Sequence, residues 1–74
     1  MDSAQIEFGR RVRAARSRRG WTQEELSRRS GLAVVQVSRI ERGAREVRLT
    51  TVVRLTEALQ VEPNELLAGL PDLR

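Results

Sequence analysis

The spacing of apolar residues is the feature that most limits what this chain can fold into. Apolar residues recur every three or four positions, as on one face of a helix, and the alternation typical of half-buried strands is absent. Glycine or proline interrupts the pattern every ten to fifteen residues, which indicates short helices joined by turns. The sequence therefore predicts an all-α fold.

We expect five helices in a single domain of residues 1–74. The predicted helices cover about residues 3–18, 23–29, 33–42, 49–59 and 63–69. In the first helix the residues expected to point inward are Ile6, Phe8, Val12 and Ala15. Gly20 suits the left-handed end of that helix, and Pro63 suits a first turn because its missing N–H costs nothing there.

A helix-start signal precedes the second predicted helix. Thr22 can cap the helix, and Glu25 follows three residues later, which together make a capping box. Trp21 before the cap and Leu26 at the fourth helical position match a hydrophobic staple. We therefore expect this helix to begin firmly at Gln23.

Residues 22–41 have the spacing of a helix-turn-helix, in which one short helix braces a second that enters the DNA major groove. At 100° per residue, the inward face of the second helix comprises Ala33, Val37, Ile40 and Glu41. The outward face carries Val35, Ser38, Arg39 and Arg42, with Gln36 at its edge. Such side chains can bind base edges, phosphates or a thymine methyl group.

Charge is distributed unequally along the chain. Residues 1–56 carry thirteen arginines against six acids, whereas residues 57–74 carry one arginine against four acids. The first part can attract a polyanion such as DNA, and the acidic end cannot.

The composition argues against an enzyme. The chain has no histidine, cysteine or tyrosine, so it lacks an obvious general base, a thiol nucleophile and a His/Cys metal site. We expect no metal, no cofactor and no small-molecule ligand. No apolar run is long enough to span a membrane and no leader opens the chain, so we expect a cytoplasmic protein.

Two stretches, GWTQEELSRRSGL at 20–32 and VSRIERG at 37–43, resemble the XRE-type helix-turn-helix family. That family includes phage repressors, Cro proteins and restriction-modification controller proteins. The segments EALQV and PNELL farther along also resemble its fourth and fifth helices. The resemblance covers about residues 6–68 and implies a compact five-helix, phage-repressor-like domain. The function it implies is a sequence-specific, double-stranded DNA-binding transcriptional regulator.

The resemblance also assigns roles to individual residues. Gln23 would bridge a phosphate and the recognition helix, and its place at a helix N-terminus suits an anion independently. Arg16 and Glu41 would form an internal ion pair that joins the first helix to the end of the third. Ala33, Val34 and Val35 replace the polar residues often found there. Base reading is therefore expected through Arg39 to a guanine and Val35 to a thymine methyl group, with Gln36 as a third candidate.

The loop after the third helix adds three arginines that can clamp phosphates. For each of them a solvated charge remains an equal alternative. The predicted DNA-binding residues are Thr22, Gln23, Val34, Val35, Gln36, Ser38, Arg39, Arg42, Arg45 and Arg48.

The last residues are rich in leucine. Residues 63–74 are predicted to form an isologous dimer interface, as the family often does, so that the homodimer reads a palindromic operator. The interface leucines would be Leu66, Leu67, Leu70 and Leu73. The alternative assigns Leu66 or Leu67 to the core and the rest to a frayed end.

An alternative function is the antitoxin of a toxin–antitoxin pair, a protein-interaction module that binds DNA only for autoregulation. Such a protein would ordinarily need a longer extension than Leu70 to Arg74.

Overall fold

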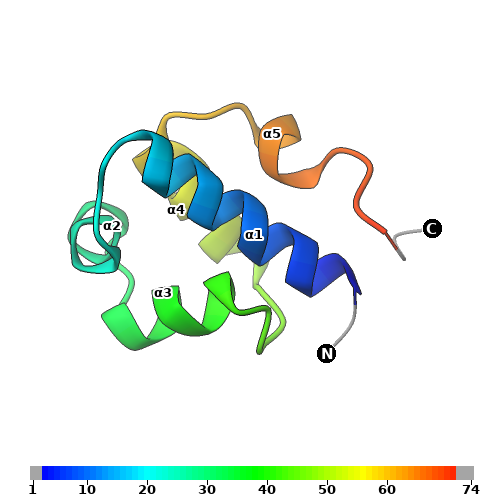
Figure 1. The fold of residues 1–74 in the computed structure, drawn as a ribbon, viewed down its shortest axis with the longest axis horizontal. Helices are drawn as coiled ribbons and strands as arrows, with labels where there is room; N and C mark the ends of the chain where they lie inside the picture. The colour runs from blue at the N-terminus through cyan, green and yellow to red at the C-terminus, as the bar shows by residue number, and fades with distance from the viewer. Residues whose placement is uncertain (1–2, 72–74) are drawn as a thin grey trace.

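The computed structural model describes residues 3–71, and these residues form five α-helices and no strand (Figure 1). The helices are α1 (Ser3–Arg18), α2 (Gln23–Ser30), α3 (Val34–Glu41), α4 (Leu49–Leu59) and α5 (Pro63–Leu67). The predicted all-α class and the five helices are confirmed. Four of the predicted ends move. The helix α2 includes Ser30, α3 loses one residue at each end because Ala33 and Arg42 are its caps, and α5 ends before Ala68.

The long helix α1 is the centre of the arrangement. It contacts α3, α4 and α5, while α2 packs against α3 and α4. In Figure 1, α3 and α5 lie on opposite sides of α1. The short helices α2 and α3 therefore pack against each other, with α1 against α3 and α4 against α2.

The core draws on all five helices, on the turn between α2 and α3, and on Leu70 after α5. Its buried apolar residues are Phe8, Val12, Ala15, Leu26, Leu32, Val37, Ile40, Leu55, Leu59, Leu66 and Leu70. Several of these side chains are completely buried, among them Leu26, Leu55 and Leu59. None of the helices within residues 3–71 is both long and apolar enough to cross a membrane.

Two residues predicted to point inward do not. Ile6 is 37% exposed, because it precedes Val12 by six positions and so lies about 120° away from it around the helix. Ala33 is exposed because it is the N-cap of α3, with extended backbone at φ −68° and ψ 149°, where helical periodicity does not apply. Gly31 is the C-cap of α2, in the left-handed region at φ 77°, and donates its N–H to the Ser27 carbonyl.

Candidate nucleic-acid interface

The start of α2 is fixed by Thr22. Its Oγ1 accepts the Glu25 N–H at 3.1 Å, and its backbone is extended, as an N-cap requires. Only half of the predicted capping box forms, because the Glu25 carboxylate accepts hydrogen bonds from Arg28 and Arg29 instead of from the Thr22 N–H. Charged donors offer the carboxylate stronger hydrogen bonds than a neutral N–H does.

Trp21 lies just before this cap. It packs half-buried on the core that contains the fully buried Leu26. The guanidinium groups of Arg19 and Arg29 stand 5.2 Å and 4.4 Å from its ring centroid. The chain therefore enters α2 along a fixed path.

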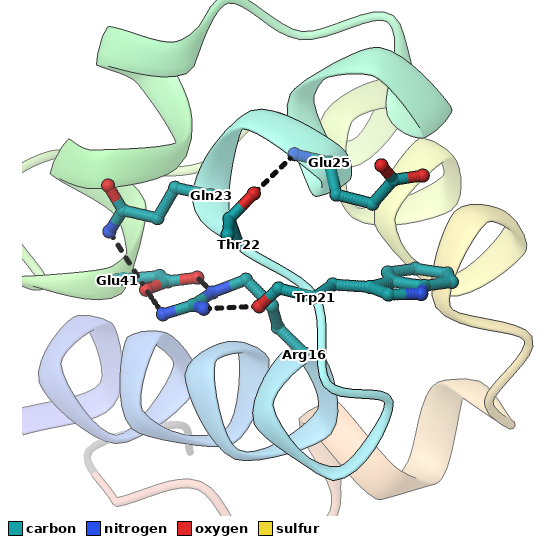
Figure 2. Close-up of polar contacts among 6 residues, drawn as sticks. All are labelled: Arg16, Trp21, Thr22, Gln23, Glu25 and Glu41. Carbon is teal, nitrogen blue, oxygen red and sulfur yellow. Dashed lines mark hydrogen bonds and ion pairs between the residues drawn. The ribbon is translucent and has the colours of Figure 1, made fainter.

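Arg16 of α1 and Glu41 of α3 form a two-point ion pair (Figure 2). The Arg16 Nε donates to Glu41 Oε2 at 2.7 Å, and Nη2 donates to Oε1 at 3.0 Å. The Arg16 Nη1 also donates to the Trp21 carbonyl at 2.7 Å. The Glu41 side chain is 3% exposed and that of Arg16 is 13% exposed. The hydrogen-bonded carboxylate raises the pKa of Arg16 above its ordinary value, and the structure thus brings together the two residues predicted to pair.

Gln23, the first residue of α2, joins the same cluster. Its Nε2 donates to Glu41 Oε1 at 3.0 Å, so Glu41 ties α1, α2 and α3 to one another (Figure 2). The amide nitrogen carries a second N–H, which this hydrogen bond leaves for another acceptor. Gln23 therefore lies where the N-terminus of α2 meets the end of α3.

The outer face of α3 is largely exposed. Val35 is 52% exposed and Val34 is 38% exposed, and Arg39 lies exposed one turn after Val35. Gln36 is exposed, but its Oε1 accepts the Ala33 N–H at 3.1 Å and so closes the N-terminus of α3. Gln36 thus provides the half of a capping box that satisfies the N-cap N–H, while Ala33 provides no side-chain acceptor for the first turn, and only the Gln36 NH₂ group remains for a ligand.

The remaining predicted contact residues lie at or beyond the end of α3. Ser38 is half-buried. Arg42 caps the helix with its backbone N–H, and Arg48 precedes α4 without giving it a side-chain cap. The side chains of Arg42, Arg45 and Arg48 are all exposed, next to the exposed face of α3.

Two of the four leucines predicted to form a dimer interface are internal. Leu66 is 1% exposed and Leu70 is 9% exposed, so both belong to the core and neither is available to a second copy. Leu67 is half-buried, and Leu73 lies outside the described residues. Apart from Ile6 on α1 and the two valines on the outer face of α3, the exposed large apolar side chains of the described residues are on α4, where Leu49 is 77% exposed and Val53, one turn later, is 46% exposed. Their spacing of four residues on a predicted helix was the signal available in the sequence.

Comparison with known proteins identifies the family. The family described as Helix-turn-helix matches residues 12–66. The chain belongs to the XRE-type helix-turn-helix family. One helix-turn-helix relative, control protein C.BamHI of Bacillus amyloliquefaciens, is 39% identical over 61 residues, which are 81% of this chain and 75% of that protein. This chain spans between 34% and 75% of the lengths of the curated relatives it matches.

Solved structures of helix-turn-helix proteins have the same fold. The restriction-modification controller protein C.AhdI from Aeromonas hydrophila is 42% identical with a TM-score of 0.81, over 84% of this chain and 94% of that chain. The P22 c2 repressor, solved in complex with a synthetic operator, is 34% identical with a TM-score of 0.76, over the same shares. The chain is thus a DNA-binding transcriptional regulator of the helix-turn-helix family, a family of regulators rather than of enzymes.

Proposed function

We propose that this helix-turn-helix protein acts as a homodimer that reads a palindromic operator, with α3 of each protomer in the major groove. The observation that carries the proposal is the exposure of Val35 and Arg39, one turn apart on the outer face of a helix whose inner end is anchored by Arg16 and Glu41. A recognition helix needs both properties, because base contacts require free side chains on a rigid support.

The side chains divide into base readers and phosphate contacts. Arg39 would bind the O6 and N7 atoms of a guanine, and Val35 would contact a thymine methyl group. Thr22 and Gln23 would hold a phosphate at the N-terminus of α2, where free N–H groups and the helix dipole favour an anion. The residues proposed to flank these contacts are Val34, Gln36, Ser38, Arg42, Arg45 and Arg48.

The dimer interface is assigned to α4. Leu49 and Val53 make an apolar strip, and the half-buried Leu67 of α5 is a further apolar residue. An isologous contact between the α4 strips of two protomers would bury Leu49 and Val53, which are costly to leave in water. The buried Leu66 and Leu70 would stay in the core of each protomer. Two recognition helices would then reach half-sites about 10 bp apart.

The biological role that we propose is control of restriction-modification genes. It is supported by the restriction-modification controller protein C.AhdI, which is 42% identical, and by control protein C.BamHI, which is 39% identical. A protein that binds genomic operators in this way would act in the cytoplasm.

Footprinting on the DNA upstream of its own gene tests the proposal. We expect protection of two symmetry-related half-sites at protein concentrations that leave a random duplex unprotected. Protection that is absent, or that covers a single unrepeated site, would contradict the proposal of a dimer on a palindrome.

A further inference from the structure

A pocket of about 410 Å³ lies between α3, the loop that follows it, the first half of α4 and the turn between α2 and α3. Its volume falls in the range of small-ligand sites. The charged residues that line it are Arg39, Arg45, Arg48, Arg54 and Glu46. Four guanidinium groups thus surround one space against a single carboxylate.

These arginines differ from the others in their side-chain contacts. Within residues 3–71, none of the four makes an ion pair or a side-chain hydrogen bond. Many arginines of α1 and α2, in contrast, are held by carboxylates or carbonyls of the same chain. Clustered like charges repel one another, so an anion in the pocket would be stabilised by all four.

Arg54 of α4 lines the pocket on the side away from the loop that follows α3. Its Nη1 lies 3.4 Å from the position that a Cβ on Gly31 would take, so its guanidinium reaches from α4 to the turn between α2 and α3. Thr50 and Thr51 complete the wall at the first turn of α4. The Arg48 side chain does not cap α4, so the backbone N–H groups in the first turn of α4 can bind an acceptor from another molecule.

We propose that this pocket binds a phosphate group, held by Arg45, Arg48 and Arg54 together with the hydroxyl and N–H groups of Thr50 and Thr51. The planar guanidinium donates two parallel hydrogen bonds to phosphate oxygens, and three such groups suit a doubly charged anion. The phosphate has two sources, the backbone of bound DNA or a free phosphate-bearing ligand. The first deepens the proposed function and rests on it, because it adds Arg54 as an anchor beside the base reader Arg39.

The test compares Arg54→Gln with Arg18→Gln. Arg18 is a matched control because it is exposed on α1, where its only ion pair within residues 3–71 is with Glu65 at 3.5 Å, far from the pocket lining. Both variants lose one positive charge. Circular dichroism verifies that both fold.

One arm measures binding to a random-sequence duplex as a function of salt. If the phosphate belongs to DNA, the slope of log K against log salt falls by about 0.9 for each protomer in Arg54→Gln, and Arg18→Gln keeps the wild-type slope. The other arm titrates sodium pyrophosphate by calorimetry without DNA. If the phosphate is free, the wild type binds pyrophosphate and Arg54→Gln binds it at least tenfold more weakly.

A loss in either arm that is confined to Arg54→Gln supports the pocket and identifies the source of its phosphate. Unchanged slope together with unchanged or absent pyrophosphate binding would overturn the inference. If the wild-type protein binds no duplex at all, the proposed function fails, and the pyrophosphate arm alone then decides about the pocket.

Discussion

The backbone of α1 at Gly9 lies directly against the carbonyl of Ile40 at the end of α3. A Cβ atom built on Gly9 would overlap the Ile40 carbonyl oxygen and lie 2.8 Å from that of Glu41. Glycine inside a helix costs about 1 kcal/mol relative to alanine, so this position trades helix stability for a close approach. The contact holds the recognition helix against α1 at the same end as the Arg16–Glu41 ion pair.

Gly9→Ala should therefore destabilise the protein, although alanine is the better helix former. The added methyl group must displace backbone, which costs about 1–3 kcal/mol after relaxation. Urea unfolding measures this. Ser17→Ala, an exposed substitution in the same helix, is the control and should be neutral or slightly stabilising. A Gly9→Ala protein as stable as the wild type would show that α1 and α3 are free to separate.

Removing one partner of the Arg16–Glu41 pair should be costly. Arg16→Met leaves the Glu41 carboxylate, 3% exposed, without its guanidinium, and we expect a loss of about 3–5 kcal/mol in unfolding free energy. The double variant Arg16→Met/Glu41→Leu should recover much of that loss, since no unpaired charge remains. Denaturant unfolding of both single variants and the double variant gives the coupling. Additive losses would mean that the two side chains do not act as a pair.

Gln23→Ala should weaken binding to every duplex alike. The substitution removes the hydrogen bond to Glu41, which contributes about 1 kcal/mol to stability, and it removes the proposed phosphate donor. A phosphate contact carries no sequence information. Anisotropy titrations should therefore give the same factor of weakening on the operator and on a random duplex. A change confined to the operator would make Gln23 a base reader.

Val53→Asp should convert the proposed dimer into a folded monomer. A carboxylate in the middle of the strip formed by Leu49 and Val53 cannot be buried against its own copy without a large penalty. Sedimentation equilibrium measures the mass, and Ala14→Asp, which adds the same charge to an exposed position of α1, should leave it unchanged. Leu66→Ala should instead lower stability by about 2–5 kcal/mol. A Val53→Asp protein that remains dimeric would move the interface away from α4.

The sequence predicted what depends on local rules. Helical spacing, the Thr22 cap and the glycine and proline interruptions are decided by residues a few positions apart, and the helices follow from them. The pairing of Arg16 with Glu41 was accessible because the whole motif resembles a known family. Within α1 the inward assignment was wrong only at Ile6, which lies about 120° from Val12 around the helix.

What the sequence did not predict depends on tertiary packing. Leucines near the end of the chain have the same composition whether a core or a partner covers them, and the structure buries Leu66 and Leu70 while leaving Leu49 exposed. The Glu25 carboxylate could accept either from the Thr22 N–H or from two nearby arginines, and it accepts from Arg28 and Arg29. Arg54 and Gly31 are far apart in the sequence, so only the packing of α4 against α2 brings them together.

The central claim is that α3 reads bases through Arg39. The most direct measurement is the affinity of wild type and Arg39→Ala for the operator, for the operator with each base pair changed in turn, and for a random duplex. We predict that Arg39→Ala loses about 1–3 kcal/mol on the operator, no longer discriminates at one base pair, and binds the random duplex almost as the wild type does. Equal weakening on all duplexes, with discrimination unchanged at every position, would contradict the claim.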